Sequence, residues 1–279
     1  MQPRPATVEY ALGEARRRMA YLDWGDPDAP IVLCVHGLTR NGRDFDALAM
    51  ALMDRFRVVC VDLPGRGASD WLQPAALYQP LTYLAPLTAL LIELGREVAW
   101  VGTSLGGICG MLAAATPGNV LSRLVLNDIG PFIPRASLAR IAQYIGGSTE
   151  FPDLAALEAH LRRIHAPFGI LSDAQWRHMA NTSARTLPDG RVALHYDPAI
   201  AVPIQAAEPQ DVDMWPVWDA IRIPRLVIRG ESSDLLLPET LERMAASGAE
   251  TFVVPDAGHA PALLDAPSIA RIRTFLETR

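Results

Sequence analysis

One serine lies between two glycines in the run Gly102-Thr103-Ser104-Leu105-Gly106. The apolar residues 98–101 predict a strand that leads into this run, and the small residues 105–115 predict a helix that follows it. A serine on a sharp strand-to-helix turn has a strained backbone and an exposed hydroxyl, and glycines two residues to either side avoid collisions in that turn. The amides at the start of the helix favour negative charge. The run therefore predicts that Ser104 is a catalytic nucleophile.

A serine hydroxyl is a weak nucleophile until a base accepts its proton. Of the six histidines, His259 follows the last predicted strand, 251–254, at the sheet edge that also carries Ser104. The histidines at 160, 165, 178 and 195 fall in a helix-rich middle section, where solvated surface positions are expected. His36 ends an early strand and is expected to brace its loop through hydrogen bonds. These positions favour His259 as the base.

The base needs an acid to orient its ring, and two strand ends offer one. Asp234 follows the predicted strand 225–230 and precedes His259 by 25 residues, so the chain order serine, acid, histidine favours it. Asp128 ends the strand after the Ser104 helix and is the serious alternative. If Asp128 is not the acid, its expected role is structural, in binding loop amides. Glu231 lies close to its strand end and is the weaker candidate. The sequence predicts Asp234 as the catalytic acid.

Acyl transfer also needs donors for a developing oxyanion. The amide of Leu105, directly after the nucleophile, is one expected donor. The loop His36-Gly37-Leu38-Thr39 after the strand 31–35 is expected to provide the other through the amide of Leu38, with Gly37 allowing close approach of the backbone. No Cys/His spacing resembles a zinc site, so no metal is expected.

The composition is that of an ordinary globular protein: 279 residues, 50% hydrophobic and 20% charged, with a formal net charge of −6. The only basic cluster is the short run Arg16-Arg17-Arg18, which gives little support to nucleic-acid binding. No stretch of eighteen apolar residues or signal-peptide pattern occurs, so no membrane partner is expected. The three cysteines are typical of buried small hydrophobes in a reducing compartment. We therefore expect a cytoplasmic protein, monomeric or homodimeric, without a cofactor.

Strand and helix patterns alternate over residues 1–130 and again over 219–279, which predicts parallel strands with helical crossovers. The segments 8–12 and 18–24 are expected to form an antiparallel hairpin at a sheet edge. Residues 131–218 are rich in proline and in helical spacing, as at 138–145, 154–164 and 173–180, and they predict an inserted helical cap. The domain prediction is thus a core in two parts, 1–130 and 219–279, around a cap at 131–218.

Over nearly its whole length the chain resembles the α/β-hydrolase superfamily. The matching residues are His36-Gly37-Leu38, the run 62–69, Gly102 to Gly106, Asp234 and Gly258-His259. The resemblance is closest to the capped esterases, lactonases and carbon–carbon-bond hydrolases, and it implies an eight-stranded, mostly parallel sheet with a helical cap and no cofactor. A serine nucleophile speaks against the haloalkane dehalogenases and epoxide hydrolases of this fold, which use aspartate.

The resulting expectation is a serine hydrolase that cleaves an ester or lactone of a small, largely apolar substrate. In the cap, Ile133, Trp176 and Trp215 are expected to line the substrate pocket, although such aromatic residues also pack caps onto cores. Arg40 or Arg66 is the expected partner for an acidic substrate. Three alternatives stay open: a carbon–carbon-bond hydrolase of a dienoate, a cofactor-free haloperoxidase, and a receptor that binds a small molecule without turnover.

Overall fold

An eight-stranded sheet forms the centre of the protein. The computed structural model describes residues 2–278, and its main sheet has the order β1-β2-β4-β3-β5-β6-β12-β13. The neighbouring strands from β4 through β3, β5, β6 and β12 to β13 are parallel, whereas β2 is antiparallel to both of its neighbours, β1 and β4. The predicted fold class is therefore confirmed. The strands are β1 (Arg4–Leu12), β2 (Ala15–Trp24), β3 (Ile31–Val35), β4 (Arg57–Val61), β5 (Val98–Thr103), β6 (Leu121–Asn127), β12 (Arg225–Gly230) and β13 (Glu250–Val254).

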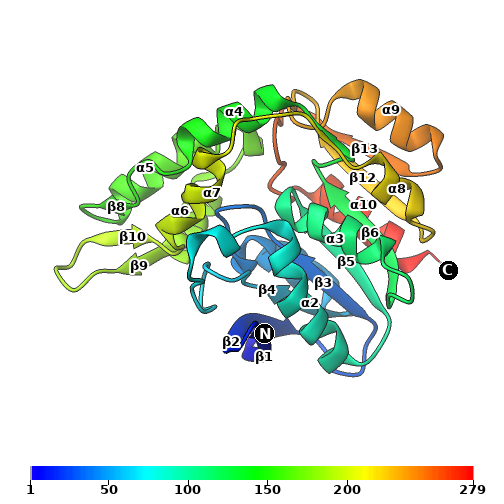
Figure 1. The fold of residues 1–279 in the computed structure, drawn as a ribbon, viewed down its shortest axis with the longest axis horizontal. Helices are drawn as coiled ribbons and strands as arrows, with labels where there is room; N and C mark the ends of the chain where they lie inside the picture. Colours follow the sequence, from blue (N-terminus) through cyan, green and yellow to red (C-terminus); the bar gives the residue numbers. More distant parts are fainter. Residues whose placement is uncertain (1, 279) are drawn as a thin grey trace.

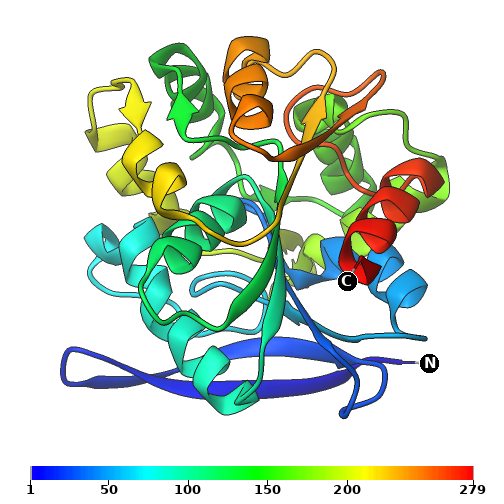
Figure 2. The ribbon, with the colours of Figure 1, turned by 90° about the vertical axis from the view of Figure 1, so that its right-hand side faces the viewer.

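The central strands are apolar throughout because helices cover both faces of the sheet. In β3, Leu33 and Val35 join one hydrophobic core, while Val32 and Cys34 join the core on the opposite face. The helices α1 (Asp46–Leu52) and α10 (Ala266–Glu277) pack on the second face, and α2 (Pro80–Leu94) and α3 (Leu105–Ala115) pack on the first. Figure 2 shows the two pairs on opposite sides of the sheet. Because these strands are parallel, their carboxyl ends all lie at the same edge of the sheet.

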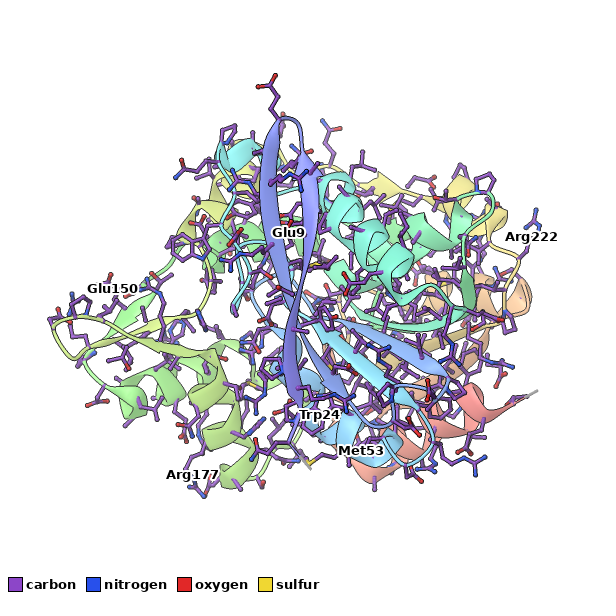
Figure 3. All side chains as sticks on the ribbon, turned by 90° about the horizontal axis from the view of Figure 1, so that it is seen from below. Glu9, Trp24, Met53, Glu150, Arg177 and Arg222 are labelled. Atoms are coloured by element: carbon purple, nitrogen blue, oxygen red, sulfur yellow. The ribbon has the colours of Figure 1, made fainter. Side chains whose placement is uncertain are left out.

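The predicted edge hairpin is present and is longer than expected. It pairs residues 4–12 with 15–23 in antiparallel register, so that Glu9 faces Arg18. Figure 3 shows the hairpin running across the molecule, with Glu9 and Trp24 labelled along it.

The chain between β6 and β12 forms a mainly helical layer over one end of the sheet. Its helices α4, α5 and α6 correspond to the three predicted ones, but short strands also occur and form a three-stranded sheet, β8-β10-β9, and a pair, β11-β7. Figure 1 shows α4 to α7 and β8 to β10 gathered on one side of the core. The bounds are β7 (Phe132–Ile133), α4 (Arg135–Tyr144), β8 (Glu150–Phe151), α5 (Leu154–Ile164), α6 (Asp173–Ser183), β9 (Ala184–Thr186), β10 (Val192–Leu194), α7 (Ala201–Ala206) and β11 (Val212–Asp213).

The last helix of the predicted cap lies elsewhere. Helix α8 (Trp215–Ala220) contacts α3 of the core, beside the strands β12 and β13 (Figure 1). Trp218 is fully buried there, and its indole nitrogen donates to Ser247 Oγ at 2.9 Å, just after helix α9 (Pro238–Ala246). The end of the 131–218 segment thus packs with the core helices. Within residues 2–278, no helix has both the length and the apolar character needed to cross a bilayer.

Candidate active site

Ser104 lies at the turn between β5 and α3. Its backbone has φ 49° and ψ −110°, a strained conformation for a residue with a Cβ. The two glycines are required by close packing: a Cβ on Gly102 would lie 2.4 Å from the carbonyl oxygen of Gly106, and a Cβ on Gly106 would lie 1.9 Å from that of Val35. The amide of Ser104 donates to Asn127 O of β6 at 3.0 Å. The predicted strand–turn–helix arrangement around Ser104 is present.

Three side chains from separate loops meet at this turn. Ser104 Oγ lies 3.1 Å from His259 Nε2, and His259 Nδ1 lies 2.7 Å from Asp128 Oδ2. Because a carboxylate can only accept, Nδ1 carries the proton and Nε2 is left to accept from the serine hydroxyl. The arrangement is that of a nucleophile, a base and an acid that orients the base.

Asp128 is held rigidly as a carboxylate acceptor. It is fully buried, directly follows β6 and has φ 55°. The amide of Gly230 donates to its Oδ1 at 2.9 Å, and the hydroxyl of Ser233 donates to its Oδ2 at 2.6 Å. Together with the bond from His259, these donors satisfy a charge that would otherwise be costly to bury.

The prediction that Asp234 orients His259 is wrong. The carboxylate of Asp234 is half exposed and accepts two bonds from Arg140 of α4, at 2.6 and 2.9 Å. The buried guanidinium of Arg229 donates to the carbonyls of Glu231, Ser233 and Leu236 and so curls the loop after β12. This curl directs the hydroxyl of Ser233 to Asp128, and the next side chain points to α4.

Asn127 joins the three loops of the site. Its side-chain amide donates to Thr103 Oγ1 at 3.1 Å and to Pro261 O at 2.8 Å, and the residue is fully buried. It thus connects the end of β5 before Ser104 to the segment after His259. Neighbouring residues on one strand end, Asn127 and Asp128, therefore hold the serine and the histidine loops.

The loop after β3 is braced as predicted. His36 Nδ1 donates to Gly37 O at 2.6 Å, and the amide of Leu63 donates to His36 Nε2 at 2.9 Å. Burial, reinforced by the nearby charge of Arg66, lowers the pKa of His36 to about 3, so the ring stays neutral. Arg66 Nε donates to Leu38 O at 2.9 Å and fixes the next residue of the loop. Gly37 is not required by close approach, because a Cβ there would meet its nearest atom at 3.8 Å.

A cavity of about 240 Å³ opens above Ser104 and His259, and its wall is mainly apolar. Both expected oxyanion residues, Leu38 and Leu105, belong to this wall. Leu105 is the first residue of α3, where backbone amides have no partner within the helix. Further apolar residues come from α4, α5 and the loops near residues 167 and 261: Leu138, Ile141, Ile164, Pro167, Phe168, Pro261 and Leu263.

Comparisons with known proteins agree with this fold. A family profile described as "Alpha/beta hydrolase family" matches residues 32–270. The chain belongs to the α/β-hydrolase family. A 3-hydroxybutyrate-oligomer hydrolase of Cupriavidus necator is 41% identical to this α/β-hydrolase over 96% of each chain. A 2-(acetamidomethylene)succinate hydrolase of Mesorhizobium japonicum is 32% identical over 82% of this chain and 81% of its own. A putative hydrolase from Rickettsia typhi, 32% identical, superposes with a TM-score of 0.92 over the full length of both chains.

The expected pocket residues of this α/β-hydrolase separate into two groups. Ile133 lies in the cavity wall, whereas Trp176 and Trp215 do not, so the prediction for the two tryptophans is wrong. The guanidinium of Arg162 lies over the ring of Trp176, and that of Arg243 lies 3.6 Å from the ring centroid of Trp215. Both rings are buried in packing between helices, the role that large aromatic side chains most often have.

The two expected cationic partners also differ in position. Arg40 belongs to the cavity wall but is already bound by Asp44 through two bonds and donates to Ser183 Oγ at 3.0 Å. Arg66 is fully buried between the rings of Tyr78 and Tyr83. Arg66 therefore fixes the loop at Leu38, and Arg40 is engaged with its neighbours.

The site contains residues that sequence reasoning missed. Asn127, Ser233 and Arg229 form the framework of Asp128 and His259, yet single polar residues at strand ends carry no distinctive sequence signal. Arg140 also belongs to the cavity wall and was not predicted. Within residues 2–278, no group of three or more His, Cys, Asp or Glu side chains is placed to hold a metal ion.

Proposed function

We propose that this α/β-hydrolase cleaves a carboxylic ester through an acyl-enzyme on Ser104. The observation that carries the proposal is the chain of contacts from Ser104 Oγ through the His259 ring to Asp128 Oδ2, at 3.1 and 2.7 Å. This is the geometry in which an imidazole can deprotonate a hydroxyl and return the proton to a leaving alcohol.

The proposed reaction has two halves. His259 accepts the proton of Ser104, Oγ attacks the ester carbonyl, and the amides of Leu38 and Leu105 stabilise the oxyanion. The ester C–O bond then breaks, and the leaving alkoxide receives the proton from His259. In the second half, water gives a proton to His259 and attacks the acyl carbon. The bond between that carbon and Ser104 Oγ then breaks, Oγ receives the proton from His259, and the acid leaves. Asp128 stabilises the imidazolium in both halves.

The substrate class follows from the cavity and the relatives. The mainly apolar cavity near 240 Å³ suits a short acyl chain. The relative at 41% identity is a 3-hydroxybutyrate-oligomer hydrolase, whose name describes esters between short hydroxy acids. We therefore infer that the substrates are short esters of this kind, with lactones as the cyclic counterpart.

The test measures ester hydrolysis by wild type and by Ser104→Ala over short acyl esters, lactones and linear 3-hydroxybutyrate oligomers. A fluorophosphonate probe, mapped by mass spectrometry, is expected to label Ser104. Ser148→Ala is the matched control, since Ser148 is exposed and lies outside the cavity of Ser104. Undiminished hydrolysis by a folded Ser104→Ala variant contradicts the proposal.

The same panel separates the alternatives. A ring-fission dienoate tests carbon–carbon-bond hydrolysis, and peroxide-dependent halogenation in carboxylate buffer tests a haloperoxidase. Tight binding of an ester without turnover by wild type indicates a receptor. We prefer ester hydrolysis for two reasons. Ser104 bonds to His259, which in turn bonds to Asp128, and the relative at 41% identity is a 3-hydroxybutyrate-oligomer hydrolase.

A further inference from the structure

Arg140 is a cation in the wall of the cavity that also contains Ser104 and His259. It extends from α4, where Leu138 and Ile141 of the same helix form apolar parts of that wall. A cation beside an apolar surface matches a molecule with a short carbon chain and one negative end.

Arg140 already binds one carboxylate, that of Asp234, in a bidentate geometry. Arg140 Nε donates to Asp234 Oδ2 at 2.6 Å, and Nη2 donates to Oδ1 at 2.9 Å, so the guanidinium and the carboxylate meet through two parallel bonds. A carboxylate of a small molecule can adopt the same geometry.

The Arg140–Asp234 pair is also easy to exchange. The side chains are 39% and 50% exposed, and ion pairs of this exposure contribute little to stability. The pair of Arg40 and Asp44 differs, since the Arg40 side chain is only 5% exposed and also donates to Ser183. Of the two arginines that residues 2–278 contribute to the cavity wall, Arg140 has the more exposed carboxylate partner.

We propose that Arg140 is a subsite for the free carboxylate of the ester substrate, which takes the place of Asp234. The proposal rests on the proposed function and deepens it, because it restricts the preferred substrates to esters with a free carboxylate at one end. Linear oligomers of hydroxy acids have this form, whereas simple alkyl esters and lactones do not.

The test compares the linear dimer and trimer of 3-hydroxybutyrate, each as the free acid and as the terminal carboxamide. The acid and the amide share the same scissile ester and nearly the same shape, so the ratio of their kcat/KM values isolates the charge. Wild type is expected to favour the acid roughly 10- to 100-fold, the range for a charge-assisted bidentate contact.

Three variants locate the effect. Arg140→Gln is expected to remove most of the acid-over-amide ratio, and Arg140→Lys to restore part of it. Asp234→Asn removes the competing carboxylate and is expected to lower KM for the acid about two- to fivefold. Arg135→Gln is the matched control, because Arg135 is exposed on the same helix and lies outside the cavity wall.

The outcomes separate the two proposals. Hydrolysis of acid and amide at equal rates by wild type, or an unchanged ratio in Arg140→Gln, contradicts the subsite and leaves ester hydrolysis intact. If wild type hydrolyses neither compound, the proposed function fails, and calorimetric binding to Ser104→Ala with and without Arg140→Gln then tests the subsite alone. Equal affinity for acid and amide in that measurement contradicts it.

Discussion

The hydroxyl of Ser233 donates to Oδ2 of Asp128 at 2.6 Å, the same oxygen that accepts from His259. The two residues lie 105 positions apart in the sequence. The loop after β12 therefore does not supply the carboxylate that bonds to His259, but it supplies a donor that holds this carboxylate in place.

Asp128→Asn is expected to lower kcat for a neutral ester by about 10³- to 10⁴-fold, because the neutral amide has no charge to stabilise the imidazolium and its NH₂ group can donate to Nδ1, which favours the wrong tautomer of His259. Asp234→Asn is expected to change kcat for the same neutral ester less than threefold, since its carboxylate faces Arg140. Steady-state kinetics of the two variants check this. The reverse order of effects would show that Asp234, in the loop after β12, is the acid.

Ser233→Ala is expected to lower kcat roughly 5- to 20-fold with little change in KM, because a hydrogen bond to a charged group contributes about 1.5 kcal/mol or more. The neighbouring Ser232→Ala is the matched control, since Ser232 Oγ donates to Ala257 O and not to Asp128. Equal losses in the two variants would mean that Ser233 acts only through the general shape of the loop.

Gly106→Ala is expected to lower the free energy of unfolding by at least ~3 kcal/mol, or to prevent folding, because the new Cβ would lie 1.9 Å from Val35 O in β3. Chemical denaturation followed by circular dichroism measures the change. A variant as stable as wild type would require β3 and α3 to move apart without cost, contrary to the packing described above.

The buried neutral ring of His36 predicts an acid sensitivity of stability. Its pKa is about 3 in the folded protein and near 6.5 in the unfolded chain, so the unfolded chain binds more protons between these values. The contribution of the neutral His36 ring to the free energy of unfolding is complete above pH 6.5. It declines by about 1.4 kcal/mol per pH unit as the pH falls towards 3.

His36→Gln is therefore expected to be less stable at pH 7 and to show a shallower dependence of unfolding free energy on pH between 6.5 and 4. Part of the pH dependence is expected to remain in the variant, because His165 is also buried and its pKa is lowered by that burial. Urea denaturation at a series of pH values measures both effects. An unchanged slope would mean that His36 is protonated in the folded protein.

Most of the fold could be predicted because its signals are local. The apolar runs around Leu33 and Trp100 define buried strands, and the glycines around Ser104 define the turn. The loop positions of His259 and His36 follow from the strands that precede them. Each of these inferences depends on a few neighbouring residues and on the parallel arrangement of the sheet.

The aspartate that bonds to His259 could not be predicted because two adjacent strands end near the same point. β6 and β12 are neighbours in the sheet, and each is followed by an aspartate within a few residues. Which of the two aspartates reaches His259 depends on the positive φ of Asp128 and on the curl that Arg229 gives to the loop before Asp234. Neither feature has a local sequence signal.

The two tryptophans were misplaced for a related reason. Periodicity shows that one side of a helix is apolar, but it does not show whether that side meets a cavity or another helix. Trp176 and Trp215 both pack beneath arginine side chains, and only the tertiary arrangement distinguishes that from a pocket.

The bond between Ser233 and Asp128 also shows how closely the two neighbouring loops approach at the site. A carboxylate at position 233 would begin within one hydrogen bond of the oxygen that now faces His259. The loops after β6 and β12 thus bring residues 128 and 233 together at a single oxygen, and a carboxylate moved between these two positions would leave Ser104 and His259 in their places.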